Sequence, residues 1–459
     1  MNTISFSYRR IFLVGLGFFS ISVVWQLYNS FMPLMLGDFI ESKAVRGFIM
    51  GLDNIANIFL IPVIGAWSDR IVNRGYGKRL PFLWAGMPAA SLFLMLMPNY
   101  TSLWMLILTD IGFLLAMTLF RSPTVSMMPD VTPEAERSQA NGIINFMGGV
   151  GALIALFVLG PLYDVEKSVP FYTGSAILLA AVLVLTVYLR RLYAQSSAPG
   201  SGKAGSSREA SGEWADAGSE TAVSGNRTAV TGSEPVFSRN ETAGAGGEPA
   251  EAREGAPWTA LLKEVRRIMT GRSHTTLVFT LLAIFFWFVG YSAVEAQFTT
   301  YAVEYLGLTE GDASLTLGFF SLTFIVFSIP SGMLARKWGR VRTIRYGIAG
   351  LIIAFALMFL IRDLAGIRAV MLFGGLFWAL VNIHSYPMIV QHAPEGKLGL
   401  YTGVYYLFSS VAASIGPFLL GGVMDLFGYP ALFAGALIAI GAAWWCMRRA
   451  DVQPGVVQP

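Results

Sequence analysis

Ionisable and amide side chains occur at a few points inside long apolar stretches of this chain. Asp53 lies within one stretch, with Asn54 beside it and Asn57 one helical turn further on, while Asp110 and Glu295 lie in two others. A charge in hydrocarbon costs roughly 2.5–3.5 kcal/mol on insertion scales, so each such residue is a functional candidate. We expect Asp53, then Glu295 and Asp110, to couple a cation, because a carboxylate partly withdrawn from water can exchange a proton near neutral pH. An adjacent oxygen-rich pair would instead suit sodium.

Amide and aromatic side chains in the same stretches are suited to a sugar. Amides hydrogen-bond hydroxyl groups, and aromatic rings pack on the C–H faces of a pyranose. We expect these groups to converge in the outer half of a central cavity, where Trp25 would contribute another ring. The alternative is helix packing, which stays open for Asp53, Asp110 and the two tyrosines after residue 400. The candidate substrate-binding residues are Gln26, Tyr28, Asn29, Asn54, Asn57, Tyr291, Tyr405 and Tyr406.

A second group of charged residues lies in or beside the short polar loops. Charges there can pair across helices and interact with helix-end dipoles, so we expect them to latch and release a cytoplasmic gate. Plain anchoring of basic residues at the inner surface is the alternative. For Arg121 we expect either an extended side chain reaching the surface or an ion pair with Asp130. The candidate gating residues are Asp69, Arg70, Lys78, Arg79, Arg121, Asp130, Arg137 and Arg336.

Membrane-spanning helices are the elements that must position these residues. The chain is 54% hydrophobic and 13% charged, with a mean hydropathy of +0.59, whereas a soluble domain carries about a quarter charged residues. Unpaired backbone groups find no water in a bilayer core, so each apolar stretch should be a helix. The sequence predicts an all-α polytopic membrane protein with these spans: 11–36, 47–68, 82–98, 102–122, 139–162, 169–192, 275–302, 313–334, 342–361, 367–388, 400–424 and 430–449.

The distribution of basic residues predicts the orientation. With both termini cytoplasmic, the outward loops hold only five of the 32 Lys and Arg residues, namely Lys43, Arg46, Lys167, Arg362 and Arg368. We therefore expect a multi-pass protein of the plasma membrane with both termini inside. Three outward acids, Glu304, Glu310 and Asp312, should be solvated loop charges.

Composition divides the chain into four parts. Residues 1–194 and 275–459 each hold six spans. Residues 195–258 are built of Gly, Ala, Ser, Thr and Glu, which cannot bury enough apolar surface to fold, so they predict a disordered cytoplasmic linker. Residues 259–274 alternate apolar and basic positions at helical spacing, which indicates an amphipathic helix at the inner membrane surface.

The two six-span parts are related to each other. A shift of 261 residues places Pro133-Glu134 on Pro394-Glu395, and the matches continue through the fifth and eleventh spans. Parallel repeats related by an axis along the membrane normal, with substrate held between them, are a transporter design. The further matched pairs are Gly142 with Gly403, Val150 with Val411, Ala152 with Ala413, Gly160 with Gly421 and Asp164 with Asp425.

The loop after the second span resembles the signature of the major facilitator superfamily. Its residues are Gly65-x-x-x-Asp69-Arg70 followed by Gly77-Lys78-Arg79, and the loop after the eighth span repeats part of the pattern, ending in Gly339-Arg340. The resemblance implies the major facilitator fold, in which twelve helices form two six-helix bundles about a pseudo-two-fold axis.

Three further segments resemble bacterial relatives of the sucrose and maltose cation symporters, a branch near the glycoside–pentoside–hexuronide symporters. They are Trp25 to Pro33, Leu52-Asp53-Asn54 through Ser68-Asp69-Arg70, and Met128-Pro129-Asp130 through Arg137 to Gly142. This resemblance implies proton- or sodium-coupled sugar uptake.

These observations favour a secondary active transporter without an organic cofactor. We expect a small-molecule substrate such as a sugar, a lipid bilayer as surroundings, no nucleic-acid partner, and function as a monomer. An exporter or exchanger of another metabolite or drug, and a membrane sensor or scaffold, remain alternatives. No enzymatic activity is expected, because no nucleophile-and-base set and no phosphate-binding Gly-x-x-x-x-Gly-Lys-Ser/Thr motif occur in the sequence. Cys446 is the single cysteine, and His384 is expected to be a packing residue rather than a proton relay.

Overall fold

The described part of the chain in this computed structural model is helical. It comprises residues 7–71, 79–132, 136–196, 257–271, 275–394 and 397–450. The N-terminal half contains α1 (Tyr8–Gly37), α2 (Lys43–Arg70), α3 (Leu80–Leu96), η1 (Met97–Asn99), α4 (Leu103–Val131), α5 (Arg137–Ile154), η3 (Ala155–Leu159), η4 (Gly160–Asp164) and α6 (Val169–Ser196). The C-terminal half contains α7 (Pro257–Thr270), α8 (Thr275–Glu304), α9 (Glu310–Trp338), α10 (Arg340–Leu360), α11 (Leu364–Val390), α12 (Leu398–Phe427) and α13 (Ala431–Ala450).

The predicted spans are confirmed. Among the described residues, 12 helices are long and apolar enough to cross a membrane, and each overlaps one predicted span. Polar side chains define where several of them begin: Ser42, Ser102, Thr309 and Asp363 each accept a hydrogen bond from a backbone N–H of the first turn. At the other end of α9, Gly339 adopts φ +83°, a left-handed conformation that glycine accommodates without strain, and the chain turns directly into α10.

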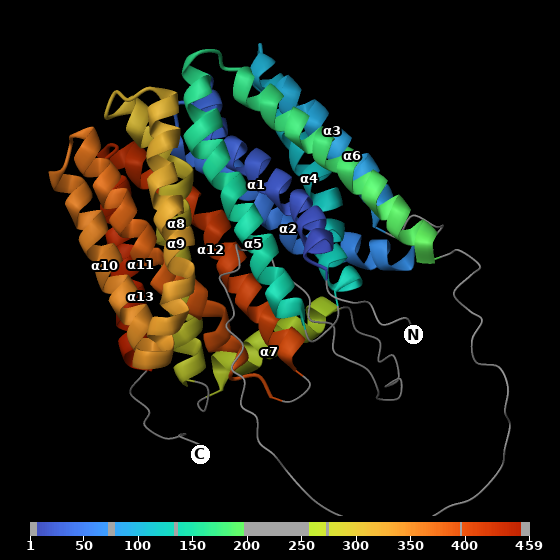
Figure 1. Cartoon of the computed structure of the whole chain (residues 1–459). Coiled ribbons are helices and arrows are strands. Elements are labelled where there is room, and N and C mark those ends of the chain that lie inside the picture. Colours follow the sequence, from blue (N-terminus) through green and yellow to red (C-terminus); the bar gives the residue numbers. More distant parts are fainter. Residues whose placement is uncertain are drawn as a thin grey trace, which may run out of the picture.

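The helices form two bundles with separate cores. Figure 1 shows the N-terminal half in blue to green and the C-terminal half in yellow to red, side by side. In the first half α1 packs on α5 and α6, and α3 packs on α4 and α6. In the second half α8 packs on α12 and α13, and α11 packs on α9 and α10. Nearly all buried apolar residues of each half belong to that half's own cluster, so the two bundles are distinct packing units.

The halves meet mainly between α2 and α12, between α9 and the segment α5–η3–η4, and between α1 and α8, with smaller contacts of α2 with α8 and of α1 with α9. The α2–α12 contact is close because small residues form it. A Cβ atom added to Gly47 or Gly51 would meet the backbone of Pro417 or Ser414, and one added to Gly421 would meet the backbone of Lys43. Glycine at these positions lets the two backbones touch, as small residues commonly do between membrane helices.

The fifth predicted span is not one regular helix. After Ile154 the α-helical pattern widens to the π-helix η3 and then tightens to the 3₁₀ helix η4. Pro161 in η4 provides the physical reason, because its ring excludes a normal i−4 hydrogen bond and crowds the preceding turn. The distortion ends at Asp164, directly beside the beginning of α9.

Helix α7 lies along the end of the bundle that is lowest in Figure 1. Ile268 and Leu261 are buried, Leu262 and Met269 are exposed, and Glu264 pairs with Lys397 near the beginning of α12. The helix therefore has one face on the protein and one face free. Most of the predicted linker 195–258 lies outside the described residues, as do residues 272–274 of the predicted amphipathic segment.

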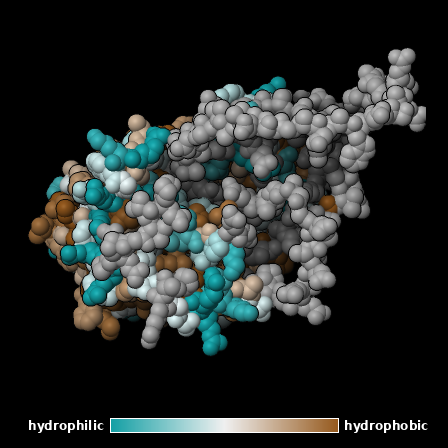
Figure 2. Space-filling model, turned by 90° about the horizontal axis from the view of Figure 1, so that it is seen from below, coloured by the Kyte–Doolittle hydropathy of each residue, from teal (hydrophilic) through white to brown (hydrophobic). Residues whose placement is uncertain are grey.

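We call the end of the bundle that carries α7 the near end and the opposite end the far end. The far end comprises the ends of α8, α12 and η4 together with the beginnings of α2 and α9. Figure 2 shows the near end, where hydrophilic side chains occupy much of the visible described surface and apolar ones lie toward its rim. Among the basic residues there, Arg336 at the end of α9 is exposed.

Candidate substrate and coupling site

Three charged residues of the N-terminal half form a buried group. Asp53 of α2 is 4% exposed, Asp110 of α4 is 1% exposed and Arg121 of α4 is 5% exposed. Asp53 interacts electrostatically with both others. Since lipid-facing residues are exposed in this structure, Asp53 faces the protein interior rather than the bilayer. Its Oδ2 atom has no hydrogen-bond partner among the described residues, and its Oδ1 atom accepts from Asn54 Nδ2 at 2.9 Å.

Aromatic rings line this group. Trp25 of α1 lies 5.0 Å from the Arg121 guanidinium carbon, in a cation–π arrangement. Tyr28 is fully buried, stacks on Phe113 at 5.4 Å, and interacts electrostatically with Asp110 and Asp53. Arg121 and Asp110 are eleven residues apart on α4, roughly 16 Å at the helical rise, so these polar and aromatic side chains extend along the bundle.

The C-terminal half contributes one acid and a pair of stacked rings. Glu295 of α8 interacts with the hydroxyl of Tyr291, one helical turn away. The Tyr291 ring stacks on Trp378 of α11 at 4.0 Å with an interplanar angle of 8°. Glu295 also interacts electrostatically with Asp53, an acid of the other half. We call Asp53, Asp110, Arg121 and Glu295 the acid cluster.

The predicted amides have different surroundings. Asn57 is 8% exposed and accepts a hydrogen bond from Thr118 of α4 at 3.2 Å, so part of its capacity serves helix packing. Gln26 and Asn29 are half-buried on α1. Gln26 is adjacent to Trp25, and Asn29 is adjacent to Tyr28, which places both on the helix that carries the aromatic wall.

Tyr405 and Tyr406 lie at another level. They form an aromatic group with Tyr386 of α11, and Tyr405 also shares a hydrogen bond with Ser385 at 2.9 Å. Ser414, which faces Gly51 of α2, is nine residues further along α12, roughly 13 Å at the helical rise. The two tyrosines are therefore nearer the near end than the acid cluster. His384, in the same region, shares a 3.0 Å hydrogen bond with Ser331 of α9 and has a packing position.

The predicted gating residues are only partly described. Lys78 lies outside the described residues, as do the side chains of Asp69 and Arg70. Arg79 pairs with Asp130 at 3.0 Å and also donates to Ser68, which ties α2, α3 and α4 together at the near end. Arg137 is half-buried at the beginning of α5.

Two expectations require correction. The expected Arg121–Asp130 pair is wrong, because Asp130 pairs with Arg79 and Arg121 is buried beside Asp53. Glu304 and Asp312 are not simply solvated loop charges. Glu304 pairs with Arg46 of α2 and accepts a hydrogen bond from Tyr429 at 2.6 Å, and Asp312 of α9 pairs with Arg368 of α11 at 2.6 Å. In both cases the actual partner belongs to another element that is distant in the sequence. The position of a residue in a loop does not predict such a partner.

Several residues of these sites have no strong sequence signal. Trp378 and Phe113 are two among many aromatic residues in apolar helices, and only packing identifies them as neighbours of Tyr291 and Tyr28. Thr118 likewise had no sequence signal, because only the packing of α2 on α4 places its hydroxyl beside Asn57.

Twelve helices of membrane-spanning length in the described part of the chain, arranged in two halves with charged residues inside them, define a polytopic membrane transporter. The sequence model of the Major Facilitator Superfamily matches residues 14–417. The chain therefore belongs to this superfamily, whose members transport small molecules by alternating access.

Sequence relatives cover only part of the chain. An uncharacterised MFS-type transporter of Methanocaldococcus jannaschii is 30% identical over 154 residues, which are 32% of this chain and 39% of the relative. The class H tetracycline resistance protein of Pasteurella multocida is 29% identical over 165 residues, or 35% and 39% of the two chains. The tetracenomycin C resistance and export protein of Streptomyces glaucescens is 24% identical over 185 residues, or 40% and 31%. The matched region is thus about two fifths of each relative or less.

Solved structures match the whole fold at low sequence identity. The nucleoside transporter NupG has a TM-score of 0.66 and 11% identity, covering 96% of this chain and 99% of its own. A bacterial homologue of the human lysosomal transporter Spinster, in an inward-facing and unoccupied conformation, has a TM-score of 0.65 and 15% identity, covering 97% and 98%. These likenesses establish the major facilitator architecture that the sequence predicted.

Proposed function

We propose that this chain is a proton-coupled secondary transporter whose coupling group is the acid cluster. The observation that carries the proposal is the burial of Asp53 and Asp110 together with Arg121 inside the N-terminal half, where Asp53 also interacts electrostatically with Glu295 of the other half. Three acids and one arginine leave more negative than positive charge in a buried region, and a bound proton relieves that imbalance at low cost.

The position of the cluster supports coupling to a conformational change. When the halves rock about the interface, the distance between Asp53 on α2 and Glu295 on α8 changes, and with it the repulsion between them. A proton bound to either acid favours the state that holds them together, so its release can be linked to opening.

The rings around the cluster support a solute with flat faces and several hydrogen-bonding groups. Trp25 and Tyr28 on one side and the Tyr291–Trp378 pair on the other provide apolar faces, while Gln26 and Asn29 provide amides. Sugar uptake remains our first candidate, with Gln26, Tyr28, Asn29, Asn54, Asn57 and Tyr291 as contacts. We retain Tyr405 and Tyr406 as contacts further toward the near end.

Export of an aromatic compound is the second candidate. It is favoured by the relatives, of which two are tetracycline or tetracenomycin resistance proteins, and by the same stacked rings. Polycyclic aromatic compounds would use the ring faces and depend less on the amides.

One transport panel distinguishes these candidates. Purified protein in proteoliposomes is supplied with labelled glucosides, galactosides, pentosides and a tetracycline, under an imposed proton gradient and then a sodium gradient. We expect accumulation of one sugar class driven by protons. Proton-driven movement of the tetracycline alone would favour the second candidate, and sodium-driven movement without proton dependence would refute the proposed coupling ion.

A further inference from the structure

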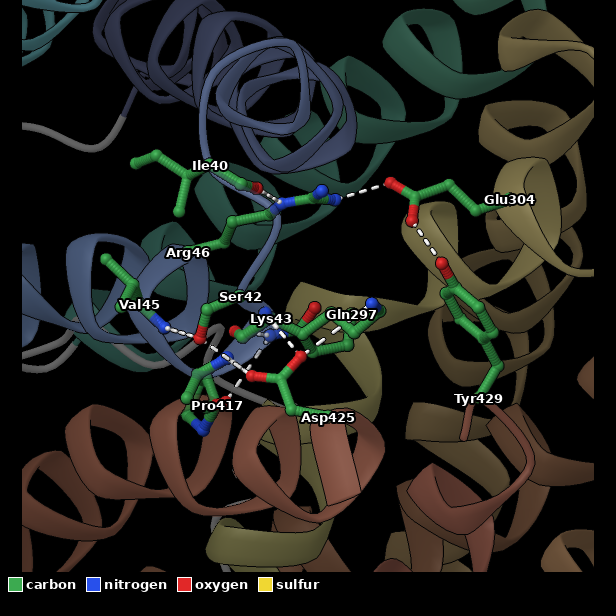
Figure 3. Close-up of polar contacts among 11 residues, drawn as sticks. Ile40, Ser42, Lys43, Val45, Arg46, Gln297, Glu304, Pro417, Asp425 and Tyr429 are labelled. Carbon is green, nitrogen blue, oxygen red and sulfur yellow. Dashed lines mark hydrogen bonds and ion pairs between the residues drawn. The ribbon is translucent and has the colours of Figure 1, made fainter. Parts of the chain in front are cut away.

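The far end of the molecule is closed by acids that cap helices of the opposite half. Asp425, at the end of α12, accepts three hydrogen bonds from the beginning of α2: from Ser42 Oγ at 2.7 Å, Lys43 N at 2.8 Å and Ala44 N at 3.0 Å. Figure 3 shows its carboxylate directed at this first turn. The side chain of Asp425 is therefore a helix cap supplied from the other half of the protein.

Asp164 makes the corresponding contact on the other side of the interface. At the end of η4, in the N-terminal half, it accepts from Thr309 Oγ1 at 2.6 Å and from Gly311 N at 2.8 Å. Thr309 is the residue before α9, as Ser42 is the residue before α2. Each acid thus contacts a hydroxyl and at least one N–H at the beginning of a helix that belongs to the opposite bundle.

The two contacts are related by the internal repeat. Asp164 falls on Asp425 under the shift of 261 residues that also aligns Gly160 with Gly421. Both glycines lie at the interface: an added Cβ at Gly160 would meet Ser314 of α9, and one at Gly421 would meet Lys43 of α2. The repeat therefore preserves both the acid and the small residue that lets the helices approach.

A cap between halves differs physically from a cap within one helix. Ser42 and Thr309 cap the third N–H group of α2 and α9, but the N–H groups of Lys43, Ala44 and Gly311 have no partner inside their own helix, and the positive end of the helix dipole attracts a carboxylate. When the halves separate at the far end, these N–H groups lose Asp425 and Asp164 together. The interaction is consequently present only in the closed state and contributes directly to the balance between states.

The two sides are unequal in strength. Around Asp425, Lys43 adds an ion pair at 3.7 Å, Gln297 of α8 donates to the Lys43 carbonyl at 2.9 Å, and Arg46 pairs with Glu304. Figure 3 shows two polar groups here: one around Asp425, which joins α12, α2 and α8 through Lys43 and Gln297, and a second in which Glu304 of α8 binds Arg46 and Tyr429. Asp164 makes fewer polar contacts with the part of the chain that the structure describes.

We propose that Asp164 and Asp425 are a symmetric pair of clasps that hold the far end closed and must both release when it opens. The Asp425 clasp is the stronger of the two. Weakening either one shifts the protein toward a state with an open far end, and weakening both shifts it further. This inference concerns the conformational balance and does not depend on the acid cluster or on the identity of the solute.

Thiol accessibility of a buried position at the far end tests the proposal. Ser314 is fully buried, lies against Gly160 across the interface, and its hydroxyl has no partner among the described residues. Ser314→Cys in a Cys446→Ala background is reconstituted in nanodiscs, where both faces are accessible, and labelled with a maleimide. We expect Asp425→Ala to raise the labelling rate by about tenfold, as expected for loss of charge-assisted hydrogen bonds, and Asp164→Ala to raise it by less.

A spectroscopic readout accompanies the labelling. Spin labels at Val165 and Leu426, which are 80% and 78% exposed, report the separation of the two halves at the far end. We expect each alanine variant to add a population at longer distance. If an alanine variant does not fold, Ser42→Ala and Thr309→Ala remove the hydroxyl partners instead and should shift both readouts in the same direction.

Asp363→Ala is the matched control. Asp363 also caps a helix, accepting from Gly366 N at 2.7 Å, but the helix is its own α11 within the C-terminal half. It should lower stability without changing labelling or distances. Unchanged labelling and distances in both Asp425→Ala and Asp164→Ala would overturn the proposal, and so would an equal rise in labelling in Asp363→Ala. Because neither readout involves transport, either outcome leaves the proposed function to its own test.

Discussion

At the scale of single residues, the acid cluster connects an energetic cost to a function. Asp53, Asp110 and Glu295 are placed where unpaired charge is unfavourable, and Arg121 offsets part of that cost. Each acid faces a different neighbour, so the three are not interchangeable. Asp53 is the acid that interacts electrostatically both with Arg121 and with Glu295 of the opposite half.

Asp53→Asn should uncouple transport from the proton gradient. The amide keeps the size and a hydrogen-bonding oxygen but cannot carry the proton. A one-unit pH gradient supports accumulation of about tenfold, or 1.36 kcal/mol, and we expect the variant to show none while exchange of labelled for unlabelled solute persists. Asp312→Asn, at an acid that pairs with Arg368 away from the cluster, is the control. Normal accumulation by Asp53→Asn would contradict the assignment.

Tyr429 should make the far end sensitive to alkaline pH. Burial, followed by its hydrogen bond to Glu304, raises the pKa of Tyr429 to about 12, from 10.0. The raised pKa means that the folded state prefers the neutral phenol, so the stabilisation is complete below pH 10.0 and is lost as the pH rises toward about 12. The free energy of unfolding of Tyr429→Phe should be about 0.5–1.5 kcal/mol lower than that of the unmodified protein at neutral pH. As the pH rises, the stability of the variant should decline less.

Thermal unfolding between pH 8 and 12 measures this effect. Tyr172→Phe, which removes a tyrosine that pairs with Asn99 in the N-terminal half, is the control. Identical pH profiles for Tyr429→Phe and the unmodified protein would show that the Glu304 contact does not contribute.

Residue types predicted which positions matter, but not how they pair. The cost of burial singled out Asp53, Asp110 and Glu295 from the sequence. Arg121 was expected at a gate because its position near the end of a predicted span says nothing about the rotation of α4, which turns the side chain toward Asp53. Pairings such as Glu304 with Arg46 join residues far apart in the chain, and only the packed helices bring them together.

At the scale of elements, the contact between α2 and α12 determines how closely the halves approach. Gly47→Ala should open this contact, because the added Cβ would overlap the backbone of Pro417, which cannot move aside as a flexible side chain would. Overpacking of this kind costs about 1–3 kcal/mol. We expect a lower melting temperature and faster labelling of the Ser314→Cys reporter.

Gly441→Ala is the control for the Gly47→Ala substitution, since a Cβ added at Gly441 meets nothing within 4 Å. It should leave both readouts unchanged. A fully active Gly47→Ala protein with an unaltered melting temperature would indicate that α2 and α12 do not pack as closely as described.

The elements themselves were predictable from hydrophobic length, and all twelve spans were found. The break of the fifth span into α5, η3 and η4 was not, although Gly160-Pro161 was visible in the sequence. Proline in a membrane helix is compatible with several outcomes, including a simple kink, and the choice depends on neighbours. Here the distorted segment contacts α9.

At the scale of the whole molecule, the two bundles are separate packing units joined by a long connection. Deleting residues 200–250, whose composition predicts no packed core, should leave transport within about twofold of the full chain, since loop-closure entropy changes only slowly with length. Initial uptake rates in proteoliposomes, normalised to reconstituted protein, measure this. A loss of transport with an unaltered melting temperature would instead favour the alternative in which the protein is a membrane sensor or scaffold and residues 200–250 take part in that function.

The internal repeat was visible in the sequence as matched letters, and its meaning emerged only in three dimensions. In the sequence, Asp164 and Asp425 are one matched pair among several, and the match alone assigns them no role. Their partners, Ser42 and Thr309, begin helices of the opposite half, and no comparison of one half with the other predicts a contact between halves. Symmetry in the chain thus reappears as symmetry in how the two bundles meet.

The capping of α2 and α9 across the interface also links this protein to the water around it. Once the far end parts, the freed N–H groups of both helices and the two carboxylates must be hydrated, so opening takes up solvent molecules that closure returns. Large neutral osmolytes that cannot enter the gap lower the activity of water and should therefore slow or disfavour that step. The transport cycle would then respond to osmotic conditions even when solute and proton gradients are held constant.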